Sequence, residues 1–409
     1  MASRNGHPFI VRKPKMRPAT NLILFVVLLT AVARRAPVSA RVISGTETPK
    51  STAQRLRERG WWPTRLDAAR KDYVGAVSCA ACHKQIALDQ QQTPMAHAAW
   101  KASETAVLRA KPTISLSELP FQTVITRDRE GSTYTVARGG EAKRGWILWS
   151  MGDGMMGQTF VLSSGGSLFE SELSYFPAIN GLDLTPGHSR AAPQDMEDAF
   201  GMRESTESAQ RCFACHTTAS SVRWQFEPAK AIPGVTCEAC HGPGARHVKA
   251  MQAHQFQKGE DAILDPDALS PIQLVDFCGA CHRAPQDVAA SKDYFPINVR
   301  FQPYRLSKSR CWSQPDPRIT CIACHDPHEQ LVQDIDSYDE KCLACHASSA
   351  APASSEDHRV FTSRMAPACP VKTSQCVSCH MPRYKVPQMH GVFTDHDIRI
   401  VRPGDPYPL

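Results

Sequence analysis

Cysteine and histidine recur in this chain of 409 residues as a five-residue motif, Cys-x-x-Cys-His, which takes up fourteen of the sixteen cysteines. Two thiols at this spacing can form thioethers with the two vinyl groups of one porphyrin, and the histidine can bind its iron from the proximal side. Random placement would give roughly 0.02 copies. The seven copies predict seven covalently bound haem c groups, at Cys79-Cys82-His83, Cys212-Cys215-His216, Cys237-Cys240-His241, Cys278-Cys281-His282, Cys321-Cys324-His325, Cys342-Cys345-His346 and Cys376-Cys379-His380.

Structural zinc and redox dithiols explain the motif less well. A closed zinc site needs four ligands and gives no reason for a histidine directly after the second cysteine in every copy. A redox dithiol would account for one copy but not for seven.

Histidines outside the motif are candidates for the second axial ligand of each iron. Seven haems need seven such ligands, and eight histidines remain after residue 40 once the motifs are set aside. This near-match favours iron held between two histidines, a coordination that resists small molecules and suits electron transfer. The eight are His97, His188, His247, His254, His328, His358, His390 and His396.

Position in the chain ranks these candidates. His247 and His328 follow the proximal His241 and His325 too closely to reach the other face of the same porphyrin, so we expect each to bind a neighbouring haem iron. We expect the same role for three histidines in the motif-dense part of the chain, His358, His390 and His396.

The other candidates are weaker ligands. His97 competes on equal terms with Met95 for one iron. His188 and His254 are expected to be ordinary solvent histidines. No residue is assigned a catalytic role.

Two cysteines, Cys311 and Cys369, stand outside the motifs. In an oxidising compartment we favour a disulfide between them over a reactive thiol.

Motif density sets the expected architecture. Six motifs lie between Cys212 and His380, within 169 residues. About 28 residues per motif are too few for a conventional apolar core, so the porphyrins themselves are expected to form the interior. This predicts a mainly α-helical multihaem cytochrome c fold with much irregular chain, in which neighbouring haems can exchange electrons.

The long gap between the first and second motifs predicts a different kind of structure. Residues 101–205 are expected to form a small, haem-poor, β-rich insertion that covers haems. Alternating apolar and polar residues predict a hairpin of Phe121–Arg127 and Ser132–Arg138 around Asp128-Arg-Glu-Gly131. Further short strands are expected at Trp146–Ser150, Gln158–Ser163 and Leu168–Phe176.

Two segments flank this insertion. Residues 41–100 form an N-terminal segment with the first motif, in which Ser51 to Lys71 is expected to be a polar helix anchored by Trp61 and Trp62. Residues 206–409 form a dense six-haem domain with a Pro-rich C-terminal tail.

The N-terminus has the layout of a signal peptide over residues 1–40. Basic residues precede an apolar run from Leu22 to Ala33, and Val38-Ser-Ala40 offers a cleavage site, so we expect export to the periplasm or beyond and no membrane span afterwards. Seven basic residues and no acidic one lie in this segment. The rest of the chain balances 40 basic against 40 acidic residues, which gives nucleic-acid binding no support.

Several of these sequences resemble the cytochrome c-554-like multihaem cytochromes, a group in a broader set with hydroxylamine oxidoreductase and pentahaem nitrite reductase. The resemblance implies stacked and perpendicular haem pairs and supports His247 and His328 as axial ligands. All seven motifs end in histidine rather than lysine, which argues against an ammonia-forming nitrite reductase. The similar runs are Tyr73-Val-Gly before the first motif, Cys237-Glu-Ala-Cys-His-Gly-Pro-Gly-Ala-Arg-His247, Cys321-Ile-Ala-Cys-His-Asp-Pro-His328, Cys376-Val-Ser-Cys-His-Met-Pro382 and Phe393-Thr-Asp-His396.

Two functions fit these features. The first is an exported heptahaem electron-transfer cytochrome working between redox partner proteins, a quinol-linked donor and a terminal acceptor. The alternative is a multihaem oxidoreductase with one open-coordination haem acting on a small nitrogen or sulfur compound.

Overall fold

The computed structural model divides the chain into Met1–Ser44 and Gly45–Leu409, and the second unit is described here. The predicted signal peptide and His358 lie outside the described residues. The described residues are 47–118, 120–289, 297–312, 318–346, 369–402 and 404–405.

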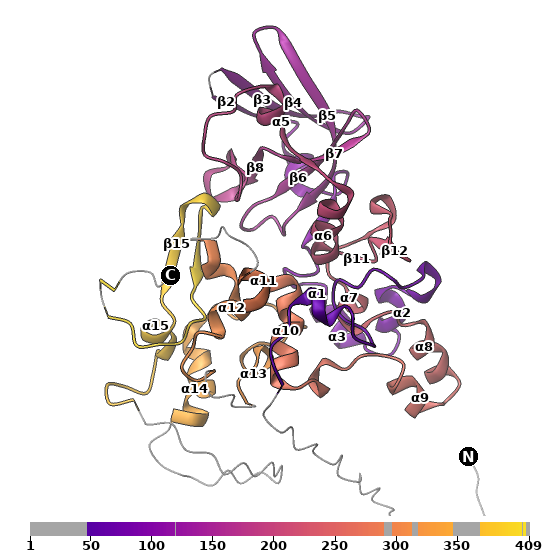
Figure 1. The fold of residues 1–409 in the computed structure, drawn as a ribbon, viewed down its shortest axis with the longest axis vertical. Coiled ribbons are helices and arrows are strands. Elements are labelled where there is room, and N and C mark those ends of the chain that lie inside the picture. Colours follow the sequence, from indigo (N-terminus) through magenta and orange to yellow (C-terminus); the bar gives the residue numbers. More distant parts are fainter. Residues whose placement is uncertain are drawn as a thin grey trace, which may run out of the picture. The chain divides into compact units, whose positions relative to one another are not determined.

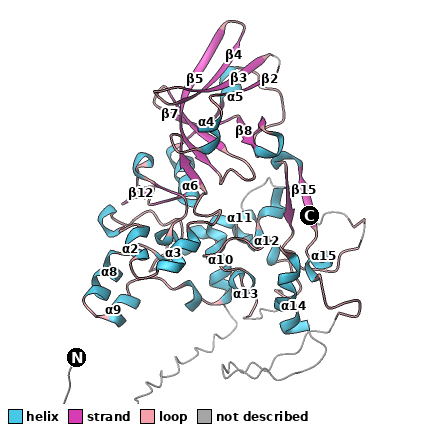
Figure 2. Ribbon diagram, turned by 180° about the vertical axis from the view of Figure 1, so that it is seen from behind, coloured by secondary structure: helices cyan, strands magenta, loops and turns pink. Residues whose placement is uncertain are grey.

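The fold is mixed, so the prediction of a mainly α-helical protein with a small β insertion is wrong. Helices account for 36% of the described residues and strands for 23%. The reason lies in the lengths of the elements: the helices that carry the motifs have only four to twelve residues, whereas the insertion builds an eight-stranded antiparallel sheet. Figures 1 and 2 show the strands of this sheet gathered in one region and the motif-bearing helices in another.

The large sheet has the strand order β10-β7-β6-β5-β4-β3-β2, and β1 pairs with β5 outside this path. Strands β8 and β9 form a separate antiparallel pair. The strands are β1 (Ala99–Lys101), β2 (Thr113–Glu118), β3 (Phe121–Arg127), β4 (Ser132–Arg138), β5 (Glu141–Met151), β6 (Thr159–Ser164), β7 (Ser167–Ser171), β8 (Leu173–Phe176), β9 (Gly181–Leu184) and β10 (Gly201–Glu204).

The predicted hairpin is confirmed by β3 and β4, which pair with Arg127 opposite Ser132. Asp128 turns the chain, because its Oδ1 accepts the backbone N–H of Gly131 at 3.1 Å. The further predicted strands are also confirmed in β5 and β6, and the strand predicted over Leu168–Phe176 is divided into β7 of the large sheet and β8, which pairs with β9.

The sheet has an apolar core of its own. Tyr134, Phe160 and Phe200 are fully buried in it, and the rings of Tyr134 and Phe200 meet edge to face with centroids 5.7 Å apart. Gly201 opens β10 at a φ of 137°, where an added Cβ would lie 2.0 Å from the carbonyl oxygen of Glu170. This part of the chain therefore packs through side chains alone, as an ordinary β structure does.

The rest of the described chain forms short helices and small hairpins. The hairpin strands are β11 (Thr217–Thr218), β12 (Ser221–Val222), β13 (Gln225–Phe226), β14 (Ile232–Pro233), β15 (Arg383–Val386) and β16 (Gly391–Thr394). The α-helices are α1 (Thr52–Arg55), α2 (Ala76–Ala80), α3 (Lys84–Gln90), α4 (Ala106–Ala110), α5 (Met196–Phe200), α6 (Thr206–His216), α7 (Cys237–His241), α8 (Ala245–Gln252), α9 (Phe256–Glu260), α10 (Pro271–His282), α11 (Pro285–Ala289), α12 (Gln302–Leu306), α13 (Cys321–Cys324), α14 (Asp339–His346) and α15 (Cys376–His380).

The polar helix expected from Ser51 to Lys71 is largely wrong. Only α1 and a 3-10 turn at Arg70–Asp72 are helical, because Gly60, at a φ of 94°, and Pro63 interrupt the segment. Trp62 nevertheless anchors it, since its ring is buried and meets Phe277 of α10 edge to face at 5.3 Å.

None of the helices in the described part of the chain is long and apolar enough to cross a bilayer.

Candidate functional site

Every motif lies on a short helix or at its end. Residues at positions i, i+3 and i+4 of a helix share one face. The two thiols and the imidazole of a motif are therefore presented on the same side of the backbone, which is the arrangement that one porphyrin needs. Helices α2, α6, α7, α10, α13, α14 and α15 carry the seven motifs in chain order.

Thiols of different motifs lie near one another, because they perturb one another's pKa. In four pairs each thiol shifts the pKa of the other: Cys79–Cys237, Cys215–Cys281, Cys278–Cys321 and Cys342–Cys376. In two further pairs the charge of one thiol raises the pKa of the other: Cys240 acts on Cys278, and Cys342 acts on Cys324.

These neighbouring thiols connect all seven motifs. The first motif lies near the third, the third near the fourth, the fourth near the fifth, the fifth near the sixth, and the sixth near the seventh. The second motif lies near the fourth, as a branch. A small cavity of about 40 Å³ is lined by residues of the second, third and fourth motifs, including Cys240 and Cys281, together with Trp61 and Tyr73.

Three proximal histidines face a second imidazole across a gap. The ring centroids are 6.5 Å apart for His83 and His247, 6.0 Å for His241 and His328, and 6.2 Å for His325 and His396. An iron between two imidazoles, with metal–nitrogen bonds of about 2.0 Å, would set the two ring centres about 6 Å apart. The observed separations therefore fit a metal ion held between each pair.

The three pairs follow one rule. In each, the facing histidine lies just after the motif two places further along the chain: His247 follows the third motif, His328 the fifth and His396 the seventh. The three sites therefore draw ligands from separate stretches of chain, which ties those stretches together.

Hydrogen bonds orient these imidazoles for metal binding. In five histidines the Nδ1 is hydrogen-bonded to a backbone carbonyl oxygen. This bond fixes the tautomer and leaves Nε2 able to bind a metal. The partners are Ala98 for His216, Leu264 for His241, Gly259 for His247, Arg399 for His380 and Thr394 for His396, at 2.9 to 3.1 Å.

Burial keeps several motif histidines neutral. It lowers the pKa of His216, His241, His282 and His325 below the usual value for imidazole. Burial, with the nearby His325 adding to it, lowers the pKa of His396 to about 4. A neutral imidazole is the form that binds a metal.

Other predicted ligands lie elsewhere. The Nε2 of His390 bonds to Asp183 Oδ2 at 2.6 Å, and its ring packs on Phe176. The ring of His97 stacks on Trp100 with centroids 4.9 Å apart. The structure therefore brings neither His390 nor His97 opposite a motif histidine, among the residues it describes.

The two histidines expected to be solvent-facing differ from each other. His254 contacts only the ring of Phe256, among the interactions seen for it. His188 is buried, and its two ring nitrogens bond to Glu172 at 2.5 Å and Glu170 at 3.1 Å. Burial opposes protonation, but the two carboxylates outweigh it and raise the pKa of His188 to about 9. Both nitrogens of His188 are thus occupied by protein.

The favoured disulfide between Cys311 and Cys369 is not formed in this structure, where Cys369 is a free thiol. Backbone N–H groups of Lys372 and Val371 lower its pKa.

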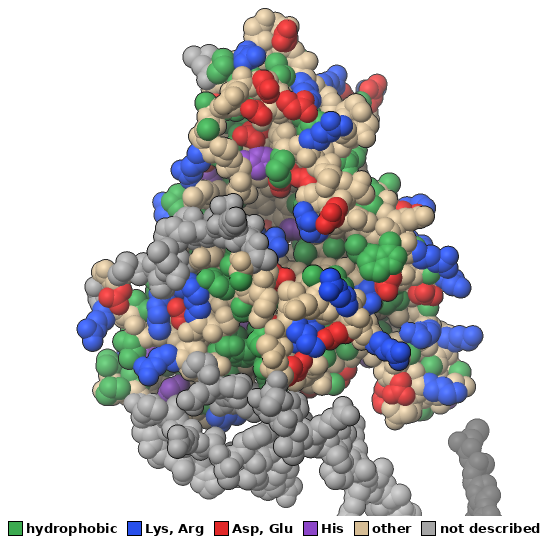
Figure 3. All heavy atoms as spheres, in the orientation of Figure 1, with side chains coloured by type: hydrophobic (Ala, Val, Ile, Leu, Met, Phe, Trp, Pro, Cys, Tyr) green, Lys and Arg blue, Asp and Glu red, His purple; other side chains and the backbone are tan. Residues whose placement is uncertain are grey.

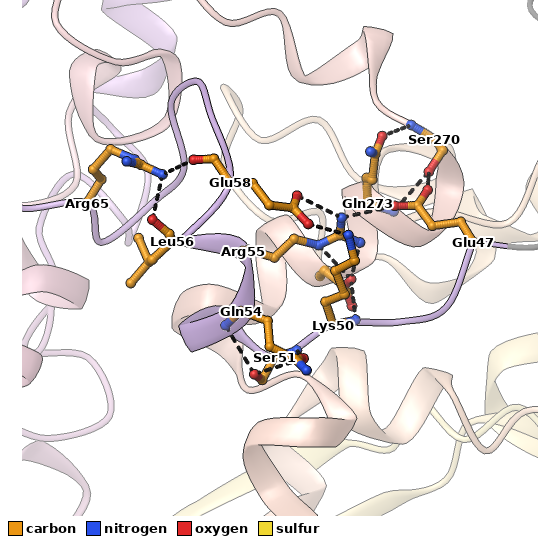
Figure 4. Close-up of polar contacts among 11 residues, drawn as sticks. Glu47, Lys50, Ser51, Gln54, Arg55, Leu56, Glu58, Arg65, Ser270 and Gln273 are labelled. Carbon is orange, nitrogen blue, oxygen red and sulfur yellow. Dashed lines mark hydrogen bonds and ion pairs between the residues drawn. The ribbon is translucent and has the colours of Figure 1, made fainter.

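Buried ion pairs, which no pattern in the sequence predicted, support the motif helices. Arg55, only 1% exposed, donates to Asp276 of α10, two residues before Cys278, and to Glu47 (Figure 4). Ser270, which caps α10, donates to the same Glu47 at 2.6 Å. The segment before the first motif is thereby locked to the helix of the fourth.

A second buried pair holds one of the facing histidines. Arg305 and Asp395 are both fully buried and bond at 2.8 Å, and Arg305 also reaches Asp397. His396 lies between these two aspartates. Its carbonyl oxygen accepts a hydrogen bond from Ser309 at 3.0 Å.

Charged side chains of both signs are interspersed on the face of the molecule seen in Figure 3, as the balanced composition predicts.

Comparisons with known proteins agree with this geometry. Residues 185–242 match the family described as cytochrome c554 and c-prime. The multiheme cytochrome MtrA of Shewanella baltica (strain OS185) is 24% identical over 206 residues, which cover 47% of this chain and 50% of that protein. The chain thus matches over about half the length of this relative. The solved outer cell wall cytochrome OcwA gives a TM-score of 0.45 at 15% identity, over 81% of this chain and 80% of its own.

The repeated motif, the facing imidazoles and the matches to the family model and to MtrA indicate one class. The protein is a multihaem c-type cytochrome that binds haem c covalently. The predicted likeness to cytochrome c-554-like proteins is confirmed, whereas the link to hydroxylamine oxidoreductase and nitrite reductase stays a prediction.

Proposed function

We propose that this protein is an exported heptahaem cytochrome that transfers electrons along seven neighbouring haems. The observation that carries the proposal is the unbroken series of neighbouring motif thiols from the first motif to the seventh. Haem c iron supplies one-electron chemistry when it is bound. The chain's own residues do the rest: they tether, ligate and space the groups.

The fourteen motif cysteines would form the thioethers, and the seven motif histidines would be the proximal ligands. We assign His247, His328 and His396 as the second axial ligands at the first, third and fifth motifs, respectively. Their Nδ1 bonds and ring separations support this assignment. His358 stays a predicted ligand. His97 and His390 would need to change position before either could bind a haem iron.

We propose export for two reasons. The chain has a predicted signal peptide, and thioether attachment of haem takes place outside the cytoplasmic membrane. We propose a quinol-linked donor and a terminal acceptor as its redox partner proteins. The polypeptide after residue 40 is balanced in charge, and the fourteen propionates of seven haems would make the loaded protein acidic, so we expect its partners to dock through a basic patch.

The alternative, an oxidoreductase, has one observation in its favour. Among the described residues, no second imidazole faces His216, His282 or His380 at the spacing of the three pairs. An iron bound by one of these alone could accept a small nitrogen or sulfur compound.

The test is a haem count by mass spectrometry with an optical and EPR spectrum of the oxidised, exported protein. The proposal predicts seven haems, all low-spin and unresponsive to cyanide, nitrite and hydroxylamine. A high-spin fraction near one seventh that binds these molecules would favour the oxidoreductase. Zinc-bound or disulfide-bridged motif cysteines would overturn both.

A further inference from the structure

We infer that two buried carboxylates, Glu238 and Asp339, are positioning residues that fix the spacing between neighbouring haem sites. Each belongs to the helix of one motif and accepts hydrogen bonds from the backbone where the helix of another motif begins. The inference rests on the proposed function.

Glu238 occupies the first variable position of the third motif, Cys237-Glu-Ala-Cys-His. A side chain there has no part in thioether formation, yet Glu238 is only 1% exposed. A carboxylate is rarely buried without partners that satisfy its charge. Its partners therefore indicate what it does.

Three backbone N–H groups from two other segments satisfy Glu238. Val74 and Gly75, directly before α2 of the first motif, donate at 2.9 and 2.8 Å. Gly244, directly before α8, donates at 2.8 Å. Helix α8 carries His247, which faces His83 of the first motif. One carboxylate of the third motif thus holds both sides of the first site.

The packing around Glu238 leaves little freedom. A Cβ added at Gly244 would lie 3.1 Å from Val74, so the starts of α2 and α8 approach closely. The thiols of Cys79 and Cys237 lie near each other beside them.

Asp339 makes the same kind of link between the sixth and seventh motifs. It is the first residue of α14, which carries Cys342, and it is only 8% exposed. Its carboxylate accepts the backbone N–H groups of Gln375 at 2.6 Å and Cys376 at 2.8 Å, where α15 begins. The thiols of Cys342 and Cys376 lie near each other, as in the first case.

Hydrogen bonds from N–H groups to an ionised carboxylate are about twice as strong as neutral ones. Each carboxylate also places a fixed negative charge beside two haem sites, where it would favour the oxidised iron. Loss of either carboxylate should therefore change two properties, the spacing of one haem pair and its potential.

The experiment compares the haem-loaded parent protein with Glu238→Gln, Asp339→Asn and, as a matched control on an exposed carboxylate of β2, Glu118→Gln. Haem content is measured by mass, magnetic coupling between oxidised haems by EPR, and midpoint potentials by spectroscopic redox titration. We expect full haem content throughout. Glu238→Gln and Asp339→Asn should each weaken the coupling of a different haem pair and shift its potential upward, whereas Glu118→Gln changes nothing.

A shorter side chain separates position from charge. Glu238→Asp keeps the negative charge but cannot reach all three donors, so it should alter the coupling and shift the potential less than Glu238→Gln. If Glu238→Gln fails to fold, Glu238→Asp replaces it in the comparison with the parent. Full haem content with coupling and potentials equal to the parent in Glu238→Asp and Asp339→Asn would overturn the inference. A parent protein without covalent haem would instead overturn the proposed function.

Discussion

At the scale of single residues, the facing imidazoles carry most of the chemistry. His396 is held opposite His325 by its Nδ1 bond to Thr394 and kept neutral by burial. Replacing it with alanine should open the sixth position of one iron. We predict that His396→Ala converts about one seventh of the haems to a high-spin form that binds cyanide. Optical and EPR titration measures this fraction. His254→Ala is the control, with no expected change, and a fully low-spin His396→Ala protein would refute the assignment.

His188 should make the stability of the protein depend on pH. Its pKa in the folded state is raised to about 9, against about 6.5 in the unfolded chain. The stabilisation is therefore fully present below about pH 6.5 and is lost as pH rises through about 9. We predict that, as pH rises from about 6.5 to about 9, the melting temperature of the parent falls more than that of His188→Gln. Equal pH profiles for the two proteins would contradict this prediction.

The sequence predicted part of this residue-level picture. The short sequence separations between His241 and His247 and between His325 and His328 predicted that each second histidine serves another motif. The sequence could not show that Asp183, more than 200 residues away in β9, bonds to His390. Nor could it link Glu238 to Val74, because such contacts depend on how distant segments pack.

At the scale of elements, buried ion pairs hold the chain around each site. Arg305 and Asp395 are both fully buried, and Asp395 also accepts a bond from the partly buried Arg399 at 2.7 Å, so Arg305→Met leaves the carboxylate with only part of its compensating charge. We predict a loss of about 3 kcal/mol in the free energy of unfolding, at the lower end of the cost of breaking a buried pair, measured by denaturant titration. Arg211→Met, which breaks an exposed pair with Glu207, should cost no more than about 1 kcal/mol.

The double variant Arg305→Met with Asp395→Leu removes both charges and should regain part of the loss. If Arg305→Met costs no more than Arg211→Met, the ion pair does not hold His396 in place.

The strands of the sheet were predictable because their alternating residues pack locally. The size of the sheet was underestimated, since nothing in the sequence showed that β1 and β10 would join it.

At the scale of the whole molecule, the motifs form one connected series in which the fourth is a junction. It lies near the second, third and fifth motifs, whereas the second is a branch. A methionine ligand raises the potential of haem iron, so His282→Met should trap electrons on the main route and His216→Met only beside it. We predict electron transit on the order of tenfold slower in His282→Met than in His216→Met. Stopped-flow reoxidation at equal haem content measures this, and equal rates would argue against the junction.

The order of the sites could not be predicted from the sequence. Motif spacing predicts only that the haems form a chain or cluster, whereas the neighbouring thiols put the third motif between the first and the fourth.

The most direct test of the account is an experimental structure of the haem-loaded protein that locates every iron. The account predicts seven irons, with nearest neighbours in the order first, third, fourth, fifth, sixth and seventh motif, and the second beside the fourth. Fewer than seven irons, or a gap that separates any one of them from this series, would contradict it.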